Sequence, residues 1–190
     1  MSTLSTNTII PVTGTTVTIG ESGDTITCGG TASGFGGGKL LQVAQTVKTD
    51  VYTSSSTSWA DIISLSITPA TSGNKLLISA HIGAAGNTTT SSGYQFRLTV
   101  DGTAVCIGDA DGSNRARVSI QDHAGSVSDF ASASSCQFLY TTTGTSAHTI
   151  KLHGQVGGGT LVFNRTVGDN SDSQYYGRSA STLTAMEVAQ

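Results

Sequence analysis

The chain has 190 residues, a formal net charge of −3 and only 11% charged residues, so it lacks the clustered Lys and Arg that nucleic-acid binding requires. No apolar run is long enough to cross a bilayer, so we expect neither a nucleic-acid partner nor membrane insertion. Gly is abundant, with 24 residues against 2 Pro, and no window repeats apolar residues near every 3.6 positions. Together with frequent Thr, Val and Ile, these features predict an all-β fold with little helix.

Residues 1–38 differ from the rest and predict an extended N-terminal β arm or a short fibrous stem. Short apolar pieces alternate with polar turns, and one such chain cannot bury its apolar residues alone. Three copies wound about one axis could bury them, or the arm could become ordered only against a neighbouring protein. The expected oligomer contacts of the arm are Ile9, Ile10, Val17, Ile19 and Ile26. The sequence GFGGG at residues 34–38 predicts a hinge before a second domain, residues 39–190.

The second domain begins with segments typical of an antiparallel β-sandwich. Residues 62–67 alternate apolar and Ser side chains, and Pro69 ends this strand because it cannot donate to a β ladder. Residues 75–82 are denser in apolar residues, which favours a strand that is buried on both faces. Asp101-Gly102 predicts a two-residue hairpin turn after the alternating segment 94–100.

Further strands are expected over residues 104–107, 115–120, 135–140 and 181–188. Residues 149–156 and 160–164 are expected to form a hairpin about the three glycines between them. Strands recurring every 8 to 12 residues or so indicate a sandwich or jelly roll. The residues expected in its core are Leu65, Ile67, Leu77, Phe96, Leu98, Phe138, Leu152 and Phe163.

No motif in the sequence points to catalysis. GFGGGK does not match a phosphate-binding loop, because Leu40 stands where Ser or Thr must follow the Lys. The sequence contains no GxSxG nucleophile elbow, and its four His lack HExxH spacing. We therefore expect no enzymatic activity, no catalytic residue and no cofactor.

One acidic segment and the three cysteines are the candidates for a metal site or a covalent link. Asp109 and Asp111 resemble the first half of a calcium loop, but the bidentate Glu is missing, and a pair with Arg115 or Arg117 is the alternative. Cys28, Cys106 and Cys136 have no metal-binding spacing, which leaves free thiols, one disulfide or an intermolecular bridge open. No other metal site is expected.

Aromatic side chains in polar loops are candidates for glycan or receptor contact. The candidate residues are Trp59, Tyr175, Tyr176, Asp169 and Asn170. An aromatic ring can stack on a sugar while Asp and Asn bind its hydroxyls. The alternatives are that Trp59 seals the edge of the sandwich and that the two tyrosines pack between subunits.

Several phrases resemble small tail fibre or fibre-like virion proteins of marine bacteriophages and cyanophages. They are GKLLQVAQTVKTDVYTSSSTSWADI, SLSITPATSGNKLLI, FRLTVDGTAVCIGDADGSNRAR, TLVFNR and YYGRSASTLTAMEVA, and the opening MSTLSTNTI with TGTTVTIGESGDTI is similar to such N-termini. The resemblance covers nearly the whole chain. It implies a non-enzymatic homotrimer with a jelly-roll domain, assembled in the host cytoplasm and located in the virion.

The leading hypothesis is therefore a homotrimeric tail fibre or spike whose arm attaches to a tail or major capsid protein. Its jelly roll would face outward, toward a host surface glycan. A capsid decoration protein and a carbohydrate-binding module are the alternatives. Met186 and Val188 share one face of the last strand, and we expect them near the trimer axis or in its core.

Overall fold

The computed structural model describes residues 13–14, 21, 39–89, 91–112, 114–123, 130–171 and 174–190. The five apolar arm residues, the predicted hinge and Cys28 lie outside these ranges. The chain divides into two units, residues 1–36 and 37–190, and the fold described below belongs to the second. The described residues contain strands and no helix, and hence no helix that could span a membrane.

The strands are β1 (Leu40–Lys48), β2 (Tyr52–Ser54), β3 (Ala60–Ile67), β4 (Lys75–Asn87), β5 (Gly93–Val100), β6 (Thr103–Val105), β7 (Ile120–His123), β8 (Ser132–Thr141), β9 (His148–Val156), β10 (Leu161–Phe163) and β11 (Ser181–Val188). All of their pairings are antiparallel. The predicted all-β class is confirmed.

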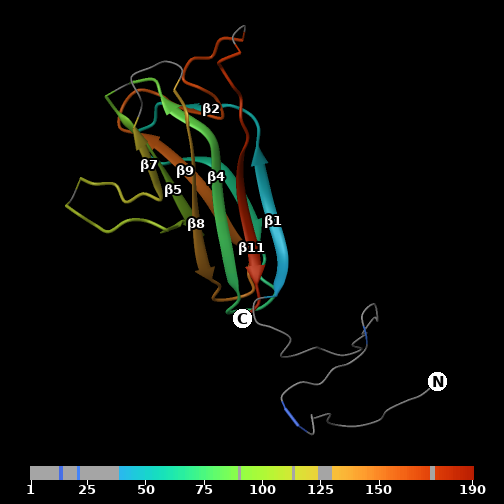
Figure 1. Cartoon of the computed structure of the whole chain (residues 1–190). Helices are drawn as coiled ribbons and strands as arrows, with labels where there is room; N and C mark the ends of the chain where they lie inside the picture. The colour runs from blue at the N-terminus through green and yellow to red at the C-terminus, as the bar shows by residue number, and fades with distance from the viewer. Residues whose placement is uncertain are drawn as a thin grey trace. The chain divides into compact units, whose positions relative to one another are not determined.

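The strands form two sheets with jelly-roll order. In the first sheet β1 pairs with β11, β11 with β4 and β4 with β8. The short β10 pairs with β4 beyond the end of β11, and β2 pairs with β10. In the second sheet β3 pairs with β9 and β9 with β5, while β6 and β7 both pair with β5. Figure 1 shows β8, β4, β11 and β1 side by side. The two sheets, of six and five strands, with the chain passing repeatedly between them, have the double-sheet arrangement of a jelly roll.

The core lies between the inner faces of the two sheets. Six of the eight predicted core residues are buried, and they are Leu65, Ile67, Phe96, Leu98, Leu152 and Phe163. The Phe96 ring meets Tyr94 and Phe163 edge to face, with centroids 5.7 and 5.8 Å away. Each fully buried apolar side chain contributes about 1.5–3 kcal/mol to folding.

The prediction that residues 75–82 are buried on both faces was wrong. Leu76, Ile78 and Ala80 are fully buried, but Leu77 between them is only partly buried and His81 is exposed. The strand therefore covers the core with one face, as expected for an antiparallel sheet. Phe138, which lies opposite Ile78 in β8, is also only partly buried because β8 is an edge strand.

The predicted hairpin over residues 149–164 was wrong as well. β9 belongs to the second sheet and β10 to the first, so Gly157–Gly159 carry the chain across the sandwich. Gly159 has φ +75°, and a Cβ there would lie 2.4 Å from Asn87 Oδ1, so the crossing requires Gly. The Asp101-Gly102 hairpin is confirmed, with φ +50° and +79° as a type I′ turn demands. The segment predicted as a strand at 115–120 is irregular up to β7.

Candidate subunit interface

The outer face of the first sheet is formed by alternate residues of β1, β11, β4 and β8. On β11, Leu183 and Ala185 are fully buried, whereas Met186 and Val188 are partly exposed. The same alternation along the other three strands follows from their period of two. These four strands thus present one continuous face away from the core.

An apolar row crosses this face from edge to edge. Val43 lies opposite Met186, Met186 opposite Leu77, and Leu77 opposite Leu139. Val43 and Leu139, on the two edge strands, are both 54% exposed. We call Val43, Met186, Leu77 and Leu139 the apolar row.

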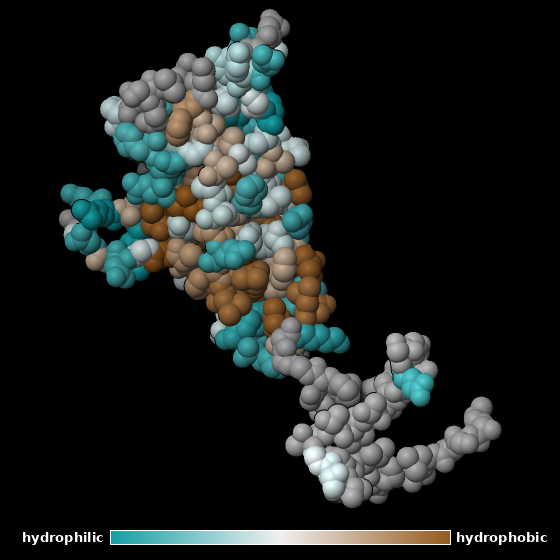
Figure 2. Space-filling view, in the orientation of Figure 1, coloured by the Kyte–Doolittle hydropathy of each residue, from teal (hydrophilic) through white to brown (hydrophobic). Residues whose placement is uncertain are grey.

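The rows on either side of the apolar row differ in polarity. Near the start of β1, Leu40 lies opposite Val188 of β11. Across the sheet, Val188 lies opposite Lys75 of β4, and Lys75 lies opposite Thr141 of β8. Toward the end of β1 comes a polar row of Gln45, Thr184, Ser79 and Gln137, in which Gln45 Nε2 donates to Thr184 Oγ1 at 2.8 Å. Figure 2 shows hydrophobic colouring gathered on the lower part of this face. The apolar row and Leu40 thus lie toward one end of the sheet, where Lys75 is the charged side chain, whereas Val47 is a separate exposed apolar residue beyond the polar row.

A buried carboxylate holds the strands that carry the apolar row. The Glu187 side chain is fully buried and accepts hydrogen bonds from Gln42 Nε2, Asn74 Nδ2 and the Ala70 N–H. Burial acts to raise the pKa of Glu187, but these bonds and one from the Thr71 backbone outweigh it and lower the pKa below its ordinary value. The ionised carboxylate thus joins β11, β1 and the turn before β4.

The structure places the predicted glycan contacts in two different elements. Asp169, Asn170, Tyr175 and Tyr176 lie in the segment between β10 and β11, which leaves the first sheet and returns to it. An isolated antiparallel β-bridge between Arg165 and Arg178 joins the beginning and the end of this segment. Asp169 Oδ1 accepts from Arg178 Nη2 at 2.6 Å, and Tyr175 is 76% exposed. We call residues 164–180 the excursion.

Asn164 fixes the start of the excursion. It is fully buried with φ +63°, and its Nδ2 donates to the carbonyls of Lys48 and Asp50 at 2.8 and 3.0 Å. Its Oδ1 accepts from Ser181 Oγ at 2.6 Å, and its N–H donates to the Ala84 carbonyl. One side chain thus ties both ends of the excursion to the connection between β1 and β2.

Trp59, by contrast, lies against Arg97 of β5, whose guanidinium is 4.3 Å from the ring centroid. This contact stacks the tryptophan on a polar side chain of the second sheet instead of leaving both ring faces open. The ring thus lies against a side chain of the central strand β5, and Tyr175 of the excursion is the more exposed aromatic side chain.

A polar network next to Arg97 has the outline of a catalytic triad. His153 Nδ1 lies 2.8 Å from Asp61 Oδ1, and His153 Nε2 lies 2.9 Å from Thr99 Oγ1. Burial lowers the pKa of His153, which favours the neutral ring that can donate to Asp61 and accept from Thr99. Thr99 is only 2% exposed, so its hydroxyl cannot reach a substrate in this conformation. The network thus gives the buried Thr99 hydroxyl a partner in His153, which the half-exposed Asp61 orients.

The calcium candidate forms an ion pair instead. Asp111 Oδ2 lies 2.9 Å from Arg115 Nη1, and both side chains are largely exposed. Within the ranges that the structure describes, no three His, Cys, Asp or Glu side chains gather as a metal site would require. The alternative of an Asp–Arg pair is therefore the one observed.

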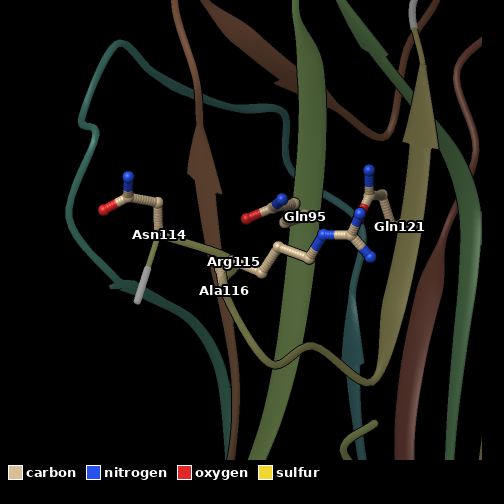
Figure 3. A pocket seen from close by; sticks show the side chains of 5 residues that line it. All are labelled: Gln95, Asn114, Arg115, Ala116 and Gln121. Atoms are coloured by element: carbon tan, nitrogen blue, oxygen red, sulfur yellow. The ribbon is translucent and has the colours of Figure 1, made fainter. Parts of the chain in front are cut away.

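A polar cleft that the sequence did not indicate lies beside this ion pair. It has a volume of about 340 Å³ and is lined by Gln95, Asn114, Arg115, Ala116 and Gln121. Figure 3 shows the Arg115 guanidinium extending between Gln95 and Gln121. These residues come from β5, β7 and the loop between β6 and β7, so only the pairing of the strands brings them together. Their amides and guanidinium are groups that bind hydroxyl and carboxylate oxygens.

The comparisons with known proteins add no family. No protein-family model matches this chain, and no curated protein matches it.

Proposed function

We propose that this chain is a homotrimeric structural protein of a bacteriophage virion, without enzymatic activity. In this proposal the jelly roll faces outward, and residues 1–38 attach to a tail or major capsid protein. The first sheet supplies the contact between subunits. The resemblance to tail fibre-like proteins supports the virion setting, and the jelly-roll order of the strands agrees with the fold that this resemblance implies.

The observation that carries the proposal is the apolar row. A sheet face that stays in water is expected to carry polar residues, yet four strands in register here contribute Val43, Met186, Leu77 and Leu139. Clustered exposed apolar residues mark contact sites, because covering them gains about 25 cal/mol for each Å² of apolar surface. Four neighbouring side chains without a charge among them can be covered at little desolvation cost.

A second copy of the chain is the partner that fits this face best. Repeating one contact around a closed ring covers the same surface in every subunit, which is how cyclic homo-oligomers form. The arm precedes β1 directly, so the strand that bears Val43 also continues into the segment expected to wind with its copies. The threefold order comes from the resemblance and from the arm.

Two alternatives remain distinct proposals. In a capsid decoration protein, the arm would lie along the capsid surface instead of forming a stem. The polar cleft and the exposed Tyr175 favour a glycan-binding role, which is compatible with a virion protein that faces a host surface. Binding of neutral or acidic oligosaccharides to the purified protein tests this role separately from assembly.

A reconstruction of virions that incorporate this chain tests the proposal. We expect three jelly rolls about a threefold axis, with the first sheets turned toward one another and density from the arm reaching tail or capsid protein. Mass spectrometry of the same particles checks that the chain is present. Single, isolated jelly rolls on the particle, or particles that lack the chain, would contradict the proposal.

A further inference from the structure

Two cysteines from opposite sheets meet at one edge of the sandwich. Cys106 follows β6 of the second sheet, and Cys136 lies in β8 of the first, where it packs against the core. Cys106 Sγ donates to the carbonyl of Gln137 at 3.6 Å, beside Cys136 in the chain. The Cys106 thiol is also close enough to Cys136 to act on it electrostatically. Two thiols 30 positions apart are thus direct neighbours.

We propose that Cys106 and Cys136 are a modification site, at which a small-molecule disulfide such as oxidised glutathione converts the two thiols into an intrachain disulfide between the sheets. Cys106 Sγ lies within hydrogen-bond distance of the residue that follows Cys136, and this proximity meets the first requirement for such a bond, because a disulfide of about 2.05 Å needs close Cβ atoms. Cys106 lies at a chain bend with φ +53° outside any strand, so it can shift by the remaining distance without breaking a ladder.

The two thiols have unequal roles in the exchange. Burial raises the pKa of Cys136 to about 12, and the neighbouring Cys106 adds to this, so Cys136 is almost never a thiolate near neutral pH. Cys106 therefore attacks first and forms a mixed disulfide, releasing one reduced glutathione. The Cys136 sulfur then attacks Cys106 Sγ, loses its proton to solvent and releases the second glutathione. Each disulfide formed in the chain reduces one oxidised glutathione to two thiols.

The bond would secure the loop that forms one wall of the polar cleft. Cys106 begins the segment that leads through Arg115 to β7, and Arg117 Nε already donates to the Gly108 carbonyl at 2.6 Å within it. Oxidation would anchor the start of this segment to β8 and so couple the cleft to the first sheet. This inference concerns the second domain alone and does not depend on trimer formation or on a virion setting.

The test uses the full-length chain with Cys28→Ser, which removes the third thiol. After incubation with oxidised glutathione, we expect the intact mass to fall by two hydrogen atoms, with the Cys106 and Cys136 peptides linked under non-reducing conditions. We also expect a rise in melting temperature of about 5 to 10 °C that dithiothreitol reverses, because a closed loop of this length restricts the unfolded chain. Linked chains, stable glutathione adducts or an unchanged mass would overturn the proposal.

Two further variants test the order of attack. In the Cys28→Ser background, Cys136→Ser should gain one persistent glutathione at the rate at which the parent protein loses its first thiol. Cys106→Ser should react at least tenfold more slowly, because only the partly buried Cys136 thiol remains and burial raises its pKa. Equal rates for the two variants would refute the assigned roles. The parent oxidation does not require either substitution to fold, so it remains decisive if one of them destabilises the domain.

Discussion

Val43 lies directly opposite Met186 in the β1–β11 pair, with both side chains on the outer face of the first sheet. The next pair, Gln42 and Glu187, is hydrogen-bonded on the inner side. One side of the same two strands is therefore bonded into the protein, while the other presents apolar groups to a partner. This division separates residues that stabilise the fold from residues that we assign to assembly.

Replacing Val43 with Lys should break the assembly and leave the domain folded. A lysine in the apolar row of each subunit would place an unpaired charge in the contact, at a cost of several kcal/mol for each copy. Sedimentation velocity should show the variant as a monomer, with a melting temperature close to that of the monomeric domain. Ser66→Lys, on the exposed face of the second sheet, is the matched control and should assemble normally. Normal assembly of the Val43 variant would exclude the outer face of the first sheet as the contact between subunits.

Glu187 should make the domain sensitive to acid. Its pKa in the folded protein is below the ordinary value of 4.5, so its stabilisation is complete above that value and is lost as pH falls through the lowered pKa. Glu187→Gln should cost about 2–3 kcal/mol at neutral pH, because charged hydrogen bonds are lost and Asn74 Nδ2 faces a weaker acceptor.

Urea unfolding of the monomeric domain between pH 3 and 7 checks the Glu187 prediction. The stability of the variant should fall less between pH 4.5 and 3 than that of the parent. Asp109→Asn, at an exposed position, is the control for removing a carboxylate and should leave the stability at pH 7 unchanged. Parallel pH curves for the parent and the Glu187 variant would refute a buried, ionised carboxylate.

Asn164 should be the most sensitive residue of the excursion. Asn164→Ala removes bonds to the carbonyls of Lys48 and Asp50 and places at φ +63° a residue that adopts this left-handed conformation less readily than Asn, for a loss of about 3 kcal/mol. Asn164→Gly should recover about 1 kcal/mol of this, because glycine adopts that backbone conformation freely. Equal losses for the two variants, measured by urea unfolding, would show that backbone strain plays no part.

Gly154 should not tolerate even one added methyl group. A Cβ at this position of β9 would lie 2.6 Å from Ile62 Cδ1 and 2.9 Å from Leu161 Cδ2, between the two sheets. Gly154→Ala should therefore cost about 1–3 kcal/mol through overpacking. Gly144→Ala has open space around it and should be near neutral, so similar melting temperatures for the two variants would contradict the described packing.

Much of the fold could be predicted from local patterns, but the pairing of strands could not. The alternation in residues 62–67, the Asp101-Gly102 turn and the strand at 181–188 are signals within a few residues, and the structure confirms them. The chain crosses between sheets at Gly157–Gly159 because both β9 and β10 find longer-range partners, which a local hairpin signal does not encode.

The candidate subunit interface could likewise be predicted only in part from local patterns. The outward position of Met186 follows from alternation along one strand, but the apolar row depends on the register of four strands far apart in the sequence. Leu77 was predicted in the core because dense apolar runs do not reveal which face lacks a covering layer. The cleft around Arg115 and the contact between Cys106 and Cys136 depend on the same long-range pairing.

The solution mass of the full-length protein tests the central claim most directly. Multi-angle light scattering at micromolar concentration should give three times the chain mass of 19.2 kDa, and deletion of residues 1–38 should weaken the trimer without unfolding the jelly roll. A monomer mass for the full-length protein would contradict a self-assembling trimer and would point to an arm that becomes ordered only against another protein.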